Sequence, residues 1–206
     1  MIKAATTEWT KRLYHTIESR WVLPRRFNKV VVHGVDVRPE HSILLLQNHF
    51  SWWDGFLGSH LCYQYLQKSY HVMVQEDQLR KFPFFRYKGA FSVRKNSRDV
   101  LESIHYAAEL LNDPKNLVLM FPQGRLQSMH VPDITFEKGV FRLIEKVQGP
   151  CQVIYCAVVL EYLESFKPTA HLHLLNLGAT EALEVHRLQE RVSAFHQEAL
   201  VGLVRK

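Results

Sequence analysis

The stretch QNHFSWWD, residues 47–54, holds a histidine and an aspartate that could act as a pair. In one continuous helix, His49 and Asp54 would lie roughly 140° apart around the axis and could not meet. However, the preceding SILLLQ reads as a buried strand and the following GFLGSHLCYQYLQ reads as a helix, so the chain must turn between them. At such a turn the imidazole can fold back onto the carboxylate. One ring nitrogen is then held and the other is available for a substrate proton, which is the arrangement of a general base.

A second candidate segment is FPQGR, residues 121–125, which also follows a strand-like apolar run. In an open α/β sheet, ligands bind beyond the carboxyl ends of the strands. We therefore expect His49 and the turn that contains Gly124 and Arg125 to face one cleft. A purely structural role for His49, in which its ring satisfies a backbone group at the strand end, stays open on the spacing alone.

The elements that must position these residues alternate along the chain. Strand-like apolar runs cover residues 28–37, 41–47, 69–75, 90–93, 116–120, 151–162 and 170–177. Helical periodicity covers residues 55–67, 98–112 (with Ser97 as its cap), 138–147 and 181–205, and residues 76–89 read as a short helix or loop. This alternation predicts an α/β fold in which helices flank a mostly parallel central sheet.

The first 26 residues have the periodicity of an amphipathic helix, which Pro24 is expected to end. Its apolar residues recur every four positions: Trp9, Leu13, Ile17 and Trp21. Two roles fit this pattern. The helix can pack on the core, or it can lie in a membrane interface with tryptophans among the headgroups and basic residues against anionic lipid. We divide the chain into this N-terminal helix, residues 1–26, and one α/β domain, residues 27–206.

The net charge of +6 favours an anionic partner, which could be nucleic acid, a membrane surface or a phosphorylated ligand. The sequence has no helix-turn-helix, RNP-type or zinc-finger pattern, so we expect no nucleic-acid partner. The three cysteines cannot all pair and none lies in a C-x-x-C spacing, which favours a reducing, cytoplasmic setting. No run approaches the roughly 20 apolar residues that span a bilayer, and the N-terminus lacks the apolar core of a secretory signal.

Several segments, in order, resemble the sequence blocks of the glycerolipid and lysophospholipid acyltransferases, of which lysophosphatidic acid acyltransferase is the familiar member. NHFSWWD resembles the N-H-x4-D motif, and KGAFSVRK (88–95) resembles the second block, a glycine followed by apolar residues and an arginine. FPQGRLQS resembles the third block, usually F-P-E-G-T-R-S, and FEKGVFRLI (136–144) the lysine–glycine segment after it. VIYCAVV (153–159) stands in place of the fourth block.

The resemblance implies transfer of a fatty acyl group from a thioester, acyl-CoA or acyl-ACP, to a hydroxyl or amine of a lipid-type acceptor. His49 would be the general base and Asp54 would orient it, without an acyl-enzyme. Backbone N–H groups near Gly124 would receive the oxyanion. The implied substrate-binding residues are Arg94, Gln123, Gly124, Arg125 and Lys138. The resemblance implies no tightly bound cofactor or metal, and a peripheral enzyme of membrane lipid biosynthesis at the inner face of the cell membrane.

The sequence also departs from the family pattern. Gln123 replaces the usual glutamate, as in a bacterial branch with varied acceptors; Arg125 replaces a threonine; and Cys156 stands where a proline is usual. These departures leave open a non-glycerolipid acceptor, such as an amino-acid lipid or a pigment, and a catalytically altered lipid-binding or scaffold relative. Among other polar residues, Lys95 and Arg98 read as solvated basic surface. His171 and His173 read as an exposed pair on one strand face rather than a metal site.

Overall fold

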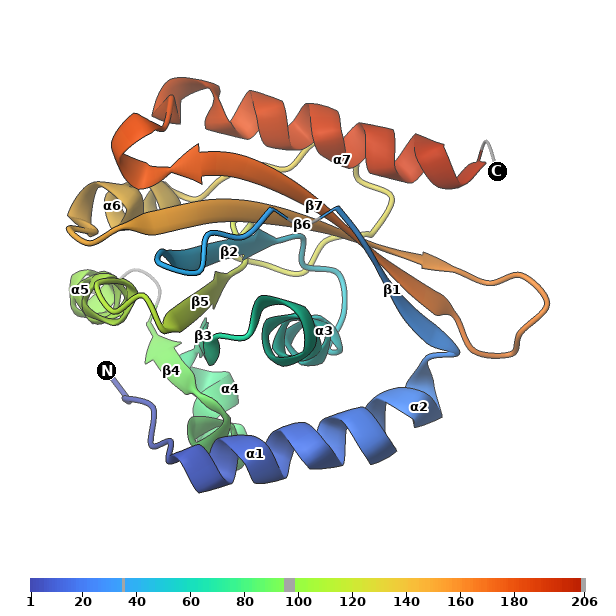
Figure 1. Cartoon of the computed structure of the whole chain (residues 1–206), viewed down its shortest axis with the longest axis horizontal. Coiled ribbons are helices and arrows are strands. Elements are labelled where there is room, and N and C mark those ends of the chain that lie inside the picture. The colour runs from blue at the N-terminus through green and yellow to red at the C-terminus, as the bar shows by residue number, and fades with distance from the viewer. Residues whose placement is uncertain (35, 95–98, 205–206) are drawn as a thin grey trace.

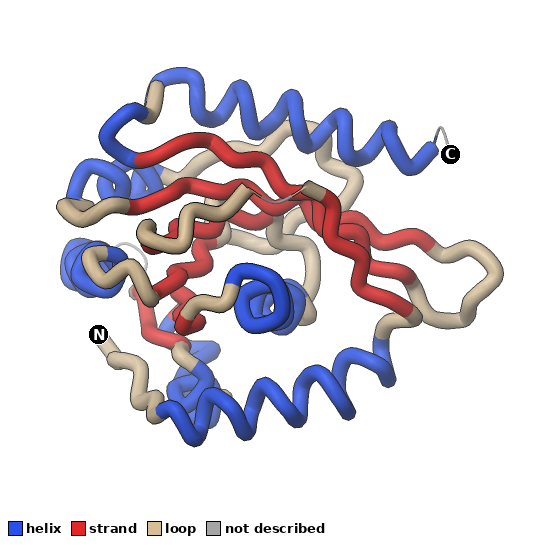
Figure 2. The backbone as a smooth tube through the Cα atoms, in the orientation of Figure 1, coloured by secondary structure: helices blue, strands red, loops and turns tan. Residues whose placement is uncertain are grey.

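A computed structural model of the chain describes residues 1–34, 36–94 and 99–204. It has one seven-stranded sheet with helices on both faces (Figures 1 and 2). The strands are β1 (Lys29–His33), β2 (Ser42–Gln47), β3 (Ser69–Gln75), β4 (Ala90–Val93), β5 (Asn116–Met120), β6 (Cys151–Glu161) and β7 (Thr169–Ala179). Their order across the sheet is β1-β7-β6-β2-β5-β3-β4. The five strands from β6 to β4 run parallel, whereas β7 is antiparallel to β6 and carries the parallel edge strand β1. The predicted α/β fold with a mostly parallel sheet is confirmed.

The α-helices are α1 (Glu8–Ile17), α2 (Leu23–Arg26), α3 (Asp54–Leu61), α4 (Glu76–Lys81), α5 (Asp99–Leu111), α6 (Lys138–Lys146) and α7 (Leu188–Val204). Two hydrophobic clusters fill the two faces of the sheet: α5, α6 and α7 pack on one face, and α2 and α3 on the other. The central strand β2 supplies both clusters, because successive side chains of a strand point to opposite faces. Leu44 and Leu46 lie in the first cluster, and Ile43 and Leu45 in the second.

The N-terminal helix begins later than the sequence predicted. Residues 1–6 lie beside β4, where the Ser92 N–H donates to the Ile2 carbonyl (2.9 Å). Thr7 then caps α1 through a reciprocal pair of hydrogen bonds with Thr10, which is the capping-box arrangement. The prediction of a helix from residue 1 was therefore wrong for the first seven residues, because this capping pair starts the helix at Glu8.

The sequence predicted that Pro24 would end the helix, and this was wrong. A π-helical turn (Glu18–Val22) separates α1 from α2, and α2 continues past Pro24. Proline is tolerated in the first turn of a helical segment, where its missing N–H has no intrahelical partner. After this wider turn, α2 begins at Leu23, so Pro24 lies in its first turn and the helix continues to Arg26.

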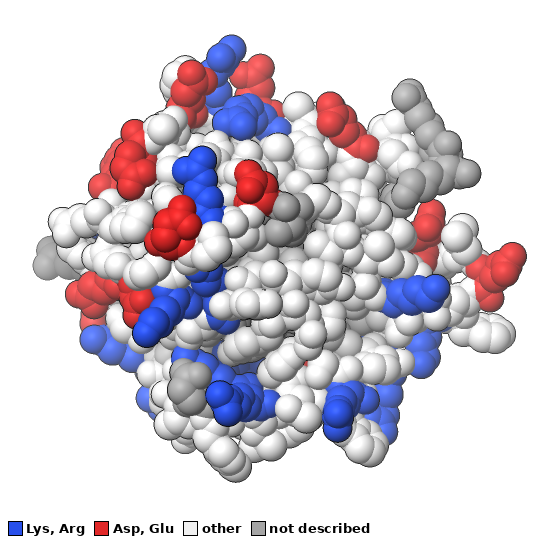
Figure 3. Space-filling model, viewed as in Figure 1, with Lys and Arg blue, Asp and Glu red and all other residues white. Residues whose placement is uncertain are grey.

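The four-residue apolar row of the N-terminal helix faces outward, with Trp9 70% and Trp21 59% exposed. The helix meets the domain with its polar side instead. There, buried Glu18 accepts a hydrogen bond from Ser59 (2.7 Å) and forms an ion pair with Lys88. Figure 3 shows basic side chains along the lower edge of the molecule, where Figure 1 places α1 and α2.

The last helix also starts later than predicted, at Leu188 rather than near residue 181. Two short 3₁₀ turns, Thr180–Ala182 and Val185–Arg187, come first. Leu183 and Val185 in this stretch pack against the core. This packing holds the chain against the sheet, so α7 begins only after it. Within the described ranges, no helix combines the length and the apolar character needed to cross a bilayer.

Candidate active site

The structure brings His49 and Asp54 together at the turn from β2 into α3. The Nδ1 atom of His49 lies 2.8 Å from Oδ2 of Asp54. The imidazole is 25% exposed, whereas the carboxylate is fully buried. With Nδ1 held by an acceptor, the neutral ring carries its proton there and keeps a lone pair on Nε2. Since His49 also lines a cavity, Nε2 is the atom that can take a proton from a ligand.

Asp54 organises the whole turn. Its Oδ2 atom also accepts hydrogen bonds from the backbone N–H groups of Phe50 and Ser51, each at 2.8 Å. Burial raises the pKa of Asp54 above its ordinary value, while His49 and the two N–H donors act in the opposite direction. Three donors on one oxygen therefore fix both the backbone that carries His49 and the direction of its ring.

A second loop, from the end of β5, is joined directly to the backbone of His49. The His49 N–H donates to Oε1 of Gln123 (2.7 Å), and the His49 carbonyl accepts from the Gln127 N–H (2.8 Å). The Phe121 ring stacks on the imidazole, with centroids 4.0 Å apart and planes inclined by 17°. Gln123 is buried, so its amide lies between the two loops and orients His49.

Asn48 is a positioning residue that the sequence reasoning left without a role. Its side chain donates to the Val158 carbonyl (3.0 Å) and accepts from the Val158 N–H (2.7 Å). These two hydrogen bonds extend the pairing between β2 and β6 and attach the turn that carries His49 to β6. Its place as the first letter of the N-H-x4-D motif was the available signal.

An apolar cavity of about 680 Å³ opens beside His49 and runs under β3 and β4. Its volume falls within the range of roughly 300–1,000 Å³ that is usual for ligand sites. Aliphatic side chains make up much of the wall: Val72, Val74, Ala90, Val93, Val100, Ile104 and Met120. Aromatic rings flank them: Trp52, Phe56 and Phe85. Such a lining suits a long, flexible apolar chain.

Gly89, the glycine of the second block, is required for steric reasons beside this cavity. Gly89 has a φ of +101°, and a Cβ atom there would overlap the Tyr70 carbonyl oxygen. Only glycine adopts this conformation freely and permits such a close approach. Gly89 thereby lets the chain turn into β4, whose Ala90 lies beside Val72 of β3 in the cavity wall.

Exposed cations lie around the same cavity. Arg125 and Lys138, both predicted as substrate-binding residues, are among its lining residues, as is Gly124. Arg142 joins them and was not predicted, although it lies four residues after Lys138 on α6 and so shares a helix face. Arginine and lysine at the mouth of a cavity can bind phosphate groups.

Arg94 lies elsewhere and is held by Glu76. Its guanidinium approaches Oε1 of Glu76 at 2.7 Å, and Arg80 shares that oxygen at 2.8 Å. Hydrogen bonds from Arg94 and then Arg80 lower the pKa of Glu76 to about 2. Among the described residues that line the cavity, Arg94 is absent. Lys95, Ser97 and Arg98, to which the sequence gave roles, lie outside the described residues.

The turn at Gly124 has a left-handed conformation, with φ at +61°. Its own N–H donates to the Phe121 carbonyl (3.0 Å) and closes the turn. Arg125 and Leu126, which follow it, line the cavity, so their N–H groups are candidates for receiving a developing oxyanion.

Comparison with known proteins adds to this geometry. The sequence model described as "Acyltransferase" matches residues 29–159, which is more than half of the chain. No curated protein matches the chain in sequence. Among solved structures, the 1-acyl-sn-glycerophosphate (LPA) acyltransferase PlsC from Thermotoga maritima superposes with a TM-score of 0.66 at 16% identity. The match covers 95% of this chain and 80% of that one, and at this identity it concerns the fold.

Proposed function

This chain belongs to the acyltransferase family, and we propose that it moves a fatty acyl group from acyl-CoA or acyl-ACP to a hydroxyl or amine of a lipid-type acceptor. The observation that carries the proposal is the His49–Asp54 pair beside an apolar cavity with cations around it. The cavity suits the acyl chain. The cations suit a phosphate, on the donor's carrier or on the acceptor.

The proposed reaction needs only proton transfers by His49. Its Nε2 takes the proton from the acceptor as the acceptor's oxygen or nitrogen attacks the thioester carbonyl. The carbonyl oxygen becomes an oxyanion, which the N–H groups after Gly124 would receive. When the carbon–sulfur bond breaks, the thiolate leaves and takes the proton from Nε2. Asp54 stabilises the transient imidazolium throughout.

We infer a direct transfer without an acyl-enzyme. The three cysteines, Cys62, Cys151 and Cys156, are all buried. Burial raises the pKa of each thiol above its ordinary value, to about 11 for Cys151. A thiol with a raised pKa is a poor nucleophile because the thiolate is the reactive form. Donor and acceptor would therefore be bound together.

We propose that the N-terminal helix binds a membrane surface. Its apolar row points away from the domain, while Glu18 and other polar groups on its opposite side make the contacts with the domain. Arg12, Arg20, Arg25 and Arg26 are exposed along the same helix. Tryptophan at headgroup depth together with basic residues is the usual composition of an interfacial helix. The surface would be the inner face of the cell membrane.

The hairpin between β6 and β7 extends this proposed surface. Its exposed apolar residues are Tyr162, Leu163 and Phe166. The hairpin contacts the end of the N-terminal helix, since Lys167 Nζ donates to the Pro24 carbonyl (2.7 Å). Just after it, the Pro168 carbonyl accepts from the Asn28 N–H (2.8 Å). An isolated apolar tip in water would be unfavourable, and a lipid interface would cover it.

The test is thiol release from acyl-CoA or acyl-ACP in the presence of a lipid extract, followed by mass spectrometry of the lipids formed. His49→Ala should abolish both signals while far-UV circular dichroism stays unchanged. His186→Ala, at an exposed histidine before α7, is the matched control and should retain activity. Transfer that persists in His49→Ala would exclude the mechanism. Lipid binding without thiol release by the wild-type protein would favour a binding or scaffold role.

A further inference from the structure

Three histidines meet on one face of the sheet, at the edge formed by β1 and β7. His33 Nε2 lies 3.0 Å from His171 Nδ1. The His33 ring also stacks on that of His173, with centroids 4.4 Å apart and planes inclined by 11°. One ring nitrogen from each of the three residues lies within 4.8 Å of the other two.

The sequence had predicted an exposed His171–His173 pair, and this was wrong. His171 is only 9% exposed. The third ring comes from β1, which pairs with β7 in parallel and sets His33 opposite His173. Because 138 residues separate His33 from His171, no local spacing in the sequence indicates the cluster.

We propose that His33, His171 and His173 bind a divalent transition-metal ion of the zinc type. Zinc binds imidazole nitrogens at about 2.0–2.1 Å, so three nitrogens of a tetrahedral site stand about 3.3 Å apart. The separation of 3.0 Å between His33 Nε2 and His171 Nδ1 is close to this value, and the three ring nitrogens all lie within 4.8 Å of one another. Rotation of the rings out of their stacked arrangement would complete the geometry. An all-nitrogen ligand set of neutral imidazoles suits zinc, copper, nickel or cobalt rather than magnesium or calcium.

Glu161 lies close enough to support such a site, at an ion-pair distance rather than in a hydrogen bond. Its Oε2 atom lies 3.4 Å from His171 Nε2, on the other side of the ring from His33. A histidine that binds a metal commonly donates its second N–H to a carboxylate, which fixes the tautomer. With its proton on Nε2, His171 presents the lone pair of Nδ1 toward His33 and the ion. A water molecule would complete the coordination.

The position of the cluster indicates a structural ion. None of the three histidines is among the described residues that line the cavity at His49. His33 is the last residue of β1, the edge strand that follows directly after α2. An ion bound by His33, His171 and His173 would cross-link β1 to β7. Because β1 follows α2, this would also strengthen the attachment of the N-terminal helix to the sheet.

The test is a Co²⁺ titration of the untagged, chelator-treated full chain, with visible absorption as the readout and Zn²⁺ as competitor. We expect one Co²⁺ per chain, an intense four-coordinate spectrum, and displacement by Zn²⁺. Excess Zn²⁺ at about 100 times Kd should raise the wild-type Tm by roughly 5 to 10 °C. A wild-type chain that gives neither a stoichiometric spectrum nor a Tm shift would overturn the proposal.

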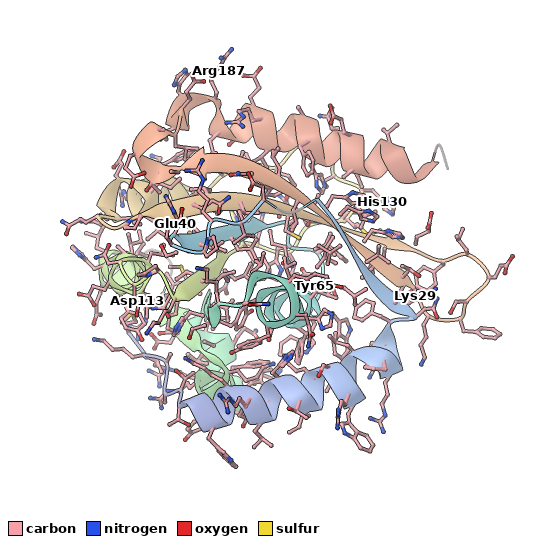
Figure 4. The ribbon with its side chains drawn as sticks, viewed as in Figure 1. Lys29, Glu40, Tyr65, Asp113, His130 and Arg187 are labelled. Atoms are coloured by element: carbon pink, nitrogen blue, oxygen red, sulfur yellow. The ribbon has the colours of Figure 1, made fainter. Side chains whose placement is uncertain are left out.

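The variants assign the ion to this cluster. His33→Gln should lose the spectrum and the Zn²⁺-dependent Tm shift, whereas His186→Gln should keep both. In Figure 4, Arg187, the neighbour of His186, lies at the upper left, in the turn just before α7. Lys29, at the start of β1, lies at the right of the same view. If His33→Gln does not fold, Glu161→Gln serves instead, with an expected 10- to 100-fold loss of affinity. Unchanged binding in either folded variant would place the ion elsewhere and refute the proposal.

Discussion

The sharpest test of the proposed mechanism is Asp54→Asn, because the structure separates what this change keeps from what it removes. All three hydrogen bonds of the turn converge on a single oxygen, Oδ2. The one carbonyl oxygen of asparagine can take that position and accept all three. The change therefore preserves the geometry of His49 and removes only the negative charge beside it.

The expected loss follows from the charge interaction in the transition state. With imidazolium and carboxylate charges centred roughly 4 Å apart and an effective dielectric constant of about 20, their attraction is about 4 kcal/mol. Because each 1.36 kcal/mol in the barrier is tenfold in rate, Asp54→Asn should lower kcat by about 10³-fold. Stability should change little. Burial disfavours the charge of Asp54, so removing it is favourable, and this offsets the cost of a buried amide group at the position of Oδ1.

The assay is steady-state thiol release, with the melting temperature measured on the same preparations. Asp113→Asn, at an exposed aspartate labelled in Figure 4, is the matched control and should be fully active. If Asp54 acts only through His49, the double variant His49→Ala/Asp54→Asn should be no slower than His49→Ala alone. An Asp54→Asn enzyme that keeps more than a tenth of the wild-type rate would refute the role assigned to the charge.

Three further predictions follow from contacts outside the His49–Asp54 pair. Gln123→Leu leaves the partly buried N–H of His49 without an acceptor, so we expect a loss of about 1–3 kcal/mol in unfolding free energy and a slower enzyme. Glu76 has its pKa lowered from 4.5 to about 2, so it stabilises the fold above pH 4.5 and this contribution is lost as the pH falls to 2. Urea unfolding of Glu76→Gln should therefore show a flatter pH dependence in that window. Trp9→Ser and Trp21→Ser should each weaken binding to anionic vesicles roughly tenfold or more in flotation assays, without lowering the Tm.

Each of these predictions has a matched control. Gln123→Glu keeps an acceptor for the His49 N–H and should be as stable as the wild type; equal damage from both Gln123 variants would contradict the assigned role. Glu198→Gln, at an exposed position on α7, should leave the pH dependence of stability unchanged. Tyr65→Ser removes an aromatic ring exposed on the face toward the viewer in Figure 4 and should not affect vesicle binding. Equal binding by the wild type and both tryptophan variants would exclude the helix as the membrane contact.

Local pattern was enough to predict most of the sheet. Apolar runs bounded by turn residues gave the observed limits of β3 and β4, because a buried strand needs a continuous apolar stretch of limited length. The same reasoning could not orient the N-terminal helix. Periodicity tells which residues share a face, but it does not tell whether that face meets protein or solvent. The position of Glu18, buried against Ser59 and Lys88, decides this in the structure.

Features that depend on distant pairings were beyond local pattern. Asn48 finds its partner 110 residues away on β6, and His33 finds His171 across the β1–β7 pairing. Neither partner can be read from spacing, because the strand order is set by packing of the whole sheet. Arg142 is a different case. Its spacing from Lys138 was visible, and only the position of α6 beside the cavity was missing.

The third sequence block shows how a contact changes the meaning of a substitution. In the sequence, glutamine in place of glutamate at position 123 reads as the loss of a negative charge from the site. In the structure, Oε1 of Gln123 accepts the His49 N–H, a task that an amide and a carboxylate oxygen perform equally well. The other end of the amide donates to Gln127, which a glutamate could not do unless Gln127 turned its own amide to donate. The substitution therefore changes a hydrogen-bond direction between two loops, while the His49 imidazole and the Asp54 carboxylate that holds it stay in place.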